Sequence, residues 1–347
     1  MSTLADPANR PRLAPGAAGA DIARPNAAAD TALAPPFAPA EDPAGRLLYL
    51  DHFGLARAPF QNTPRPEFFY GACDRGQMLY ALLYCLRQDQ GITLLTGEEG
   101  SGKSMLAHML RHCAPAAMDI ALIGRSALQR ADVVPMIADR LGISTGRAAP
   151  DESMRLLQRV LTQRQGAGRR AVLIVDDAQD LRDEVLDEIR RLALLQGPAH
   201  ALLHILLVGQ DALRLRVADA ANRDLDACIR QRLRLAPLPV DEVGAYLAFR
   251  MQRAGASADA FDPAAARMIG RGAMGLIGRV NILADKCLMA AFNDDFPRVM
   301  RSHVELALND AAFRAMRASH APPVAPARAS TLGRLWRRYG LGRVGPR

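Results

Sequence analysis

Two kinds of apolar run alternate along the middle of the chain. Short runs rich in Val, Ile and Leu predict buried strands, and longer stretches with apolar residues every three or four positions predict helices. The expected strands are 92–96, 118–123, 171–175, 202–208 and 233–238, and the expected helices are 74–88, 105–111, 132–141, 152–164 and 183–196. Helices between strands allow those strands to lie parallel. We therefore predict an α/β fold with a parallel five-stranded sheet.

The pattern changes at both ends of this region. From Val240 onward the periodicity is helical throughout, and Asp262-Pro263 supplies an N-cap followed by proline at a first helical position. Residues 1–45 are mostly Ala and Pro with almost no large apolar side chains, so they cannot bury enough surface to stay ordered. The domains we expect are a disordered segment 1–45, a core 46–239, a helical lid 240–312 and a flexible basic tail 313–347.

A glycine-rich stretch between the first strand and the helix after it carries the clearest chemistry. Its sequence GEEGSGKS fits the phosphate-binding pattern GxxxxGK[ST]. The glycines let backbone N–H groups approach an anion, Lys103 reaches the β- and γ-phosphates, and Ser104 binds Mg²⁺. We expect ATP and Mg²⁺ as cofactors, with the nucleotide bound by Gly97, Glu98, Glu99, Gly100, Ser101, Gly102, Lys103 and Ser104.

A pair of acidic residues follows a later strand. The apolar run 171–175 is followed directly by Asp176 and Asp177. In P-loop enzymes, such a strand delivers its first acid to the Mg²⁺ site, and the next acid orients or deprotonates the attacking water. Together with the phosphate loop, the pair predicts a site that hydrolyses ATP at the carboxyl edge of the sheet.

Several short motifs occur in the order and spacing of a known family. They are Tyr49, Phe53-Gly54-Leu55, Pro59-Phe60, Thr63-Pro64, Phe68-Phe69-Tyr70 and Leu94-Leu95-Thr96-Gly97. Over roughly residues 48–300 the chain resembles the general secretion pathway protein A (ExeA-type) AAA+ ATPases. The resemblance implies an AAA+/ASCE P-loop fold and a homo-oligomer that hydrolyses ATP to act on secretion or cell-envelope machinery.

The same resemblance assigns roles to further residues. Gln210, at the end of the strand 202–208, matches the sensor-1 position, and Asp177 stands where the family has Glu. Arg232, preceding the last strand, matches a family arginine that can reach a neighbouring subunit's γ-phosphate, and Arg230 is a second candidate. A basic, solvated face is the alternative interpretation of these two arginines.

The lid contains a shifted version of another family signature. Gly275 and Asn281 align with the ends of Gly-x-Pro-Arg-x-x-Asn, which puts Gly278 at the family's arginine and Arg279 one position late, about 100° around the helix. Two interpretations are open. Either Arg279 substitutes as a nucleotide contact, or the lid no longer contacts the nucleotide in this way.

The aromatic segment before the phosphate loop also has two interpretations. Phenylalanines and prolines are dense between 49 and 70. They either form a cap that frames an adenine pocket or brace the sheet at its N-terminal side.

Charge is concentrated at the C-terminus. The net charge is +8, and from Arg314 onward there are eight arginines and no acid, so the rest of the chain is close to neutral. Residues 332–343 combine a helical apolar face with Trp336 and arginines, which suits a peripheral contact with the inner membrane. A solvated, disordered end is an equally weighted interpretation, and DNA binding is less favoured. Five scattered cysteines, no secretory signal and no long apolar run predict a cytoplasmic protein.

These patterns leave three functional hypotheses. The first is an AAA+ ATPase that drives or regulates assembly of a secretion or envelope system. The alternatives are a DNA-associated, transposition-type ATPase regulator and a weakly hydrolysing, nucleotide-gated scaffold. The loop 97–104 and Asp176 favour the ATPase, whereas Asp177 and the displaced Arg279 favour the scaffold.

Overall fold

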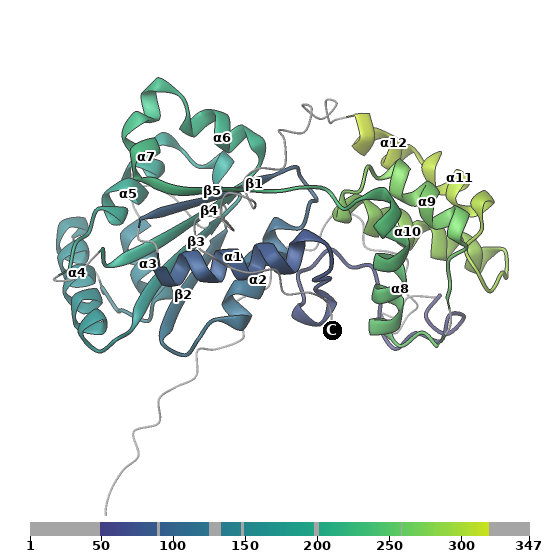
Figure 1. Ribbon diagram of the computed structural model, residues 1–347, viewed down its shortest axis with the longest axis horizontal. Helices are drawn as coiled ribbons and strands as arrows, with labels where there is room; N and C mark the ends of the chain where they lie inside the picture. Colours follow the sequence, from purple (N-terminus) through teal and green to yellow (C-terminus); the bar gives the residue numbers. More distant parts are fainter. Residues whose placement is uncertain are drawn as a thin grey trace, which may run out of the picture.

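The computed structural model describes residues 49–88, 91–124, 133–146, 149–197, 201–257 and 259–318. Two lobes are visible in Figure 1, one built on a sheet and the other on helices alone. The segments predicted as disordered, 1–45, and as a membrane contact, 332–343, lie outside the described residues. Within the described ranges, no helix is both long enough and apolar enough to cross a membrane.

The first lobe contains the predicted five-stranded sheet. Its spatial order is β2-β3-β4-β1-β5, and each neighbouring pair is parallel. The carboxyl ends of the strands therefore share one edge, as a phosphate-binding fold requires. The strands are β1 (Ile92–Gly97), β2 (Met118–Gly124), β3 (Arg170–Asp176), β4 (Leu203–Gly209) and β5 (Ile229–Leu235).

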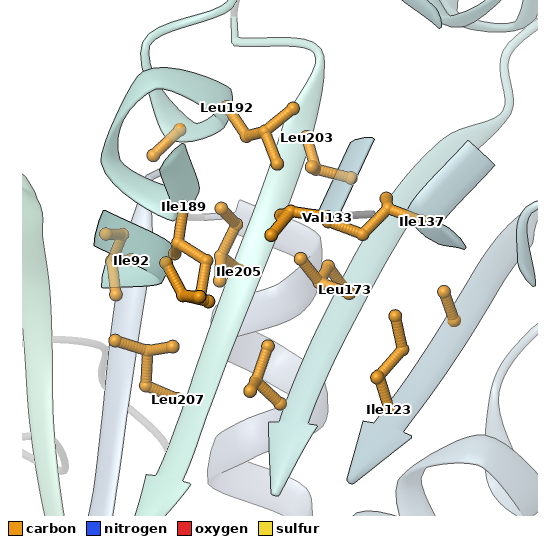
Figure 2. Close-up of a cluster of buried hydrophobic side chains, with 14 of the residues drawn as sticks. Ile92, Ile123, Val133, Ile137, Leu173, Ile189, Leu192, Leu203, Ile205 and Leu207 are labelled. Atoms are coloured by element: carbon orange, nitrogen blue, oxygen red, sulfur yellow. The ribbon is translucent and has the colours of Figure 1, made fainter. Parts of the chain in front are cut away.

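Helices cover both faces of this sheet because successive strand residues point to opposite sides. In β3, Leu173 packs into the cluster under α3, α4 and α5, whereas Ile174 packs into the cluster under α1 and α2. Figure 2 shows the first cluster, where Ile189 of α5 and Ile137 of α3 lie over the sheet. The helices are α1 (Asp74–Gln88), α2 (Lys103–Cys113), α3 (Val133–Arg140), α4 (Pro150–Gly166) and α5 (Asp183–Ala193).

Strand β5 begins earlier than the sequence predicts. Arg230 and Arg232 lie inside it, not before it, and their exposed side chains alternate with the buried Ile229 and Leu233. β5 is an edge strand beside β1. One of its faces can therefore carry arginines while the other is buried, which a search for apolar runs does not detect.

The second lobe is helical, as predicted from Val240 onward. Asp262 caps α9, accepting hydrogen bonds from the N–H groups of Ala264 and Ala265. The helical part continues past the predicted boundary at 312, because Phe313 of the last helix is fully buried in this lobe. The helices are α8 (Val243–Ala254), α9 (Pro263–Gly272), α10 (Ile277–Asn293), α11 (Arg301–Leu308) and α12 (Ala311–Ala318).

The segment before α1 packs mainly on the helical lobe. Tyr49, Phe60 and Phe68 are buried in one cluster with residues of α8, α9 and α10. Arg250 of α8 anchors the segment by donating hydrogen bonds to the carbonyls of Pro59 (2.5 Å) and Gln61 (3.0 Å). Phe69 also packs against the cluster under α1 and α2, so the segment contacts both lobes.

Candidate nucleotide-binding site

A cavity of about 530 Å³ lies where the carboxyl edge of the sheet meets the helical lobe. That volume is within the usual range for small-ligand sites, about 300–1,000 Å³. Aromatic residues of the N-terminal segment, Phe68 to Tyr70, line one side. The predicted site residues that line the cavity are Glu99, Gly100, Gly102, Lys103, Ser104, Asp177, Gln210 and Arg279.

The phosphate loop has the backbone that its glycines predict. Gly100 and Gly102 have φ values of +77° and +100°, a region that favours glycine. A Cβ at Gly97 would lie 2.6 Å from the carbonyl oxygen of Leu235 in β5. Gly102 is the N-cap of α2, so the first N–H groups of that helix face the cavity side of the loop.

The Lys103 side chain is hydrogen-bonded to the phosphate loop itself. Its ammonium donates hydrogen bonds to the carbonyls of Glu98 (2.8 Å) and Gly97 (3.0 Å). Burial lowers the pKa of Lys103, and the nearby carboxylates of Asp176 and Asp177 oppose that shift. The cation is therefore largely desolvated, a state in which contact with a phosphate oxygen is strongly favourable.

Ser104 and Asp176 meet at the end of β3. Burial raises the pKa of the Asp176 carboxyl, while a hydrogen bond from Ser104 lowers it. The N–H of Asp177 also donates to Asp176 Oδ1 at 3.0 Å. A hydroxyl and a carboxylate are the hard oxygen ligands that Mg²⁺ takes beside nucleotide phosphates, so these residues fit that metal.

Asp177 and Gln210 lie on neighbouring strand tips and are joined by a residue that the motif search left aside. Asp177 is exposed and has a left-handed backbone with φ +54°. The Gln179 amide donates to Asp177 Oδ1 at 3.3 Å and accepts from the Gln210 N–H at 3.0 Å.

Arg279 is among the residues that line the cavity despite its displaced position in the sequence. The residue is only 3% exposed, and among the described residues neither terminal nitrogen of its guanidinium has a hydrogen-bond partner. Burial lowers the pKa of Arg279, and the charges of Glu99 and Glu98 oppose this. A buried cation without a partner is costly unless an anion satisfies it.

The two arginines of β5 do not line the cavity. Arg232 forms an ion pair with Asp226 at 2.6 Å and also bonds to two backbone carbonyls. Arg230 is exposed, and among the described residues its guanidinium has no hydrogen-bond or ion-pair partner. Both side chains are therefore on a surface and not in the site of their own chain.

Sequence reasoning missed Arg75 and a polar network beside the cavity. Arg75, 5% exposed, donates to the carbonyls of Ser101 and Ala236, both at 3.4 Å. A cation in the first turn of α1 opposes the helix dipole, which was the available signal. The network links Asn62, Asn281, Tyr246 and Arg250.

This fold and cavity define a P-loop nucleotide-binding protein of the AAA+ class. Residues 86–217 match a family model described as AAA domain. The ORC2 protein of Aeropyrum pernix superposes with a TM-score of 0.57 and 17% identity, covering 73% of this chain and 71% of that one. Cdc6p of Pyrobaculum aerophilum gives a TM-score of 0.55 and 18% identity over 84% of both chains. At these identities the likeness shows the fold alone.

Sequence similarity agrees with the resemblance predicted from the motifs. General secretion pathway protein A of Aeromonas hydrophila is 32% identical over 261 residues, which cover 75% of this chain and 48% of that protein. The chain is thus similar to general secretion pathway protein A, and its residues 86–217 match an AAA domain. It spans about half the length of this relative.

Proposed function

We propose that the protein binds Mg-ATP in this cavity and hydrolyses it. The observation that carries the proposal is a group of charged and polar side chains at one cavity: Lys103, Ser104 and Arg279 line it, and Asp176 is hydrogen-bonded to Ser104. Such a group suits a triphosphate with its metal better than a neutral or singly charged ligand.

Each residue has a distinct role in the proposed reaction. Water attacks the γ-phosphorus while the bond to the β–γ bridging oxygen breaks, giving ADP and inorganic phosphate. Asp177 orients this water and accepts its proton, and Lys103 and Arg279 neutralise charge on the phosphate oxygens. Ser104 and Asp176 would hold Mg²⁺, which adds electrostatic stabilisation when it is bound.

We also propose, from the similarity to general secretion pathway protein A, that hydrolysis drives or regulates assembly of a secretion or cell-envelope system. A homo-oligomer in the cytoplasm, in peripheral contact with the inner membrane, is the assembly that this role implies. The similarity covers 48% of that relative, and the partner in this proposal is an envelope protein of unspecified identity.

The experiment is steady-state ATP hydrolysis by the full chain, with Lys103→Ala and Asp177→Glu alongside direct measurements of ATP binding. We expect wild-type turnover, and we expect Lys103→Ala to bind no ATP. Tight ATP binding by Lys103→Ala would refute the site.

A second candidate function is a nucleotide-gated scaffold that hydrolyses ATP poorly. The shorter Asp177, in place of the family's Glu, favours it because catalysis is sensitive to small misplacements. Binding without turnover by the wild type, with turnover gained in Asp177→Glu, would support the scaffold and contradict the ATPase.

A further inference from the structure

The side chain of Gln179 connects two strand tips that the proposed reaction requires to act together. Gln179 lies in the short 3-10 turn Ala178–Asp180 that follows β3. Its Oε1 accepts the N–H of Gln210 at 3.0 Å, at the end of β4. Its Nε2 donates to Asp177 Oδ1 at 3.3 Å and to Asp180 Oδ2 at 3.0 Å. All four residues line the cavity.

These contacts determine which way the amide faces. An amide oxygen accepts and an amide nitrogen donates, so the reversed orientation would set two donors against each other at Gln210 and two acceptors against each other at Asp177. In the observed orientation, both the oxygen and the nitrogen of the Gln179 amide have hydrogen-bond partners. The negative charge of Asp177 also strengthens the hydrogen bond that it accepts.

The surrounding backbone maintains this position. Gly209 leaves room for the amide, since a Cβ there would lie 2.8 Å from Gln179 Oε1. Arg216, in α6 (Asp211–Val217), donates to the carbonyl of Gln179 at 3.1 Å and pairs with Asp183. The turn is thus attached to the β4–α6 segment by backbone as well as by side chain.

We infer that Gln179 is a positioning residue that holds the Asp177 carboxylate in line with the tip of β4, where Gln210 faces the γ-phosphate. This inference rests on the proposed ATP hydrolysis. The exposed Asp177 otherwise has a free χ1 rotation, and its short side chain leaves little tolerance for misalignment with the attacking water. Gln179 removes that freedom without contacting the phosphates itself.

The test uses one substitution at Gln179 that changes its contact with Asp177 and another that shortens the side chain. Gln179→Glu keeps an acceptor for the Gln210 N–H but replaces the donor to Asp177 with a charged oxygen. Gln179→Asn keeps the amide but is one methylene shorter, so it cannot span both contacts. Gln252→Glu, on an exposed position of α8, is the matched charge control. The readouts are kcat and KM for the full chain, with thermal melting to verify folding.

We expect both Gln179 variants to lose about 10- to 100-fold in kcat with KM changed by less than about 2-fold, because misalignment affects the transition state more than the ground state. Gln252→Glu should resemble wild type.

The failures of the two proposals are distinguishable. An active wild type with unchanged kcat in both Gln179 variants would overturn the positioning role and leave ATP hydrolysis standing. A wild type that binds ATP but never turns it over would overturn hydrolysis and, with it, the role of Gln179.

Discussion

At the scale of single residues, we expect the buried cation of Arg279 to favour an anionic ligand in the cavity. Its guanidinium is buried, and within the described part of the chain neither terminal nitrogen has a hydrogen-bond partner. Leaving a charge in that condition destabilises the folded chain, so we propose that the residue serves ligand binding at the expense of stability. A γ-phosphate would satisfy both nitrogens at once, as arginine does with planar or tetrahedral anions.

Replacing Arg279 with Ala should therefore weaken ATP binding while leaving the empty protein at least as stable. We expect the Kd for ATP to rise about ten-fold or more, the usual effect of losing a charged hydrogen bond, and the Kd for ADP to change little. Titration calorimetry with both nucleotides, together with melting of the apo protein, checks this. Arg271→Ala, at an exposed position of α9, is the control. Equal losses for ATP and ADP would contradict a γ-phosphate contact.

The carboxyl of Asp176 predicts a pH dependence for Mg-ATP binding. Burial raises its pKa above the ordinary aspartate value, and Mg²⁺ needs the deprotonated form. As pH falls through this raised pKa, protons compete with the metal, and the Kd for Mg-ATP should rise about ten-fold per pH unit below it. Binding measured between neutral and acid pH tests the sign. Asp176→Asn should bind weakly at every pH, and ATP with chelator should not show the same dependence.

At the scale of elements, the first turn of α10 rests directly on the phosphate loop. The N–H of Gly278 donates to the carbonyl of Gly100 at 2.8 Å, and a Cβ on Gly278 would lie 3.0 Å from the Gly100 Cα. Only a glycine lets the two backbones approach so closely. The same contact places the backbone of position 278 directly against the loop.

This contact predicts that introducing the family's arginine at position 278 does not restore a conventional site. Gly278→Arg should force α10 away from the loop, lower the melting midpoint and weaken ATP binding, because its Cβ meets backbone and not a movable side chain. Gly278→Ala should act in the same direction but less, costing about 1 kcal/mol for the overpacked contact. Melting and ATP titration of both variants test the order. Tighter ATP binding by Gly278→Arg would show that the lid tolerates the shift.

The contact between Gly278 and Gly100 shows which features of the site could not be predicted from the sequence. The strands, the loop 97–104 and the position of Asp176 and Asp177 after a strand were predictable because each has a local sequence pattern. The position of Arg279 at the cavity was not predictable, since it depends on Gly278 meeting Gly100 across a long sequence separation. Arg230 and Arg232 were placed before β5 because an edge strand can carry charge on one face. Gln179 was missed because its proposed role depends on a tertiary contact with Gln210.

At the scale of the whole molecule, the cavity lies between two lobes, and the arginines assigned by resemblance lie elsewhere. Arg230 and Arg232 are absent from the cavity lining, and they occupy an exposed face of the edge strand β5. In this chain they do not contact a nucleotide held by Lys103. If they act on a γ-phosphate, it is that of a second copy, in a head-to-tail arrangement. Arg230 is then the better placed, because Arg232 would first have to release Asp226.

A mixing experiment tests this arrangement. One inactive chain carries Lys103→Ala with intact arginines, and the other carries Arg230→Ala and Arg232→Ala with an intact cavity. If the arginines act between copies, an equal mixture should recover activity at about one site in four, because random head-to-tail pairing joins an intact cavity to an intact arginine donor at that frequency. Hydrolysis per chain by the wild type should also rise with protein concentration.

Two sets of variants test whether the result is specific to Arg230 and Arg232. Single substitutions separate the arginines: we expect Arg230→Ala to lose most turnover and Arg232→Ala to lose less, with ATP affinity retained in both. Arg223→Ala, an exposed arginine of α7 (Arg223–Cys228), should behave as wild type. A mixture no more active than its separate components, from chains that each still assemble, would mean that the β5 arginines are only a solvated basic face. Turnover would then depend on the cavity of one chain alone.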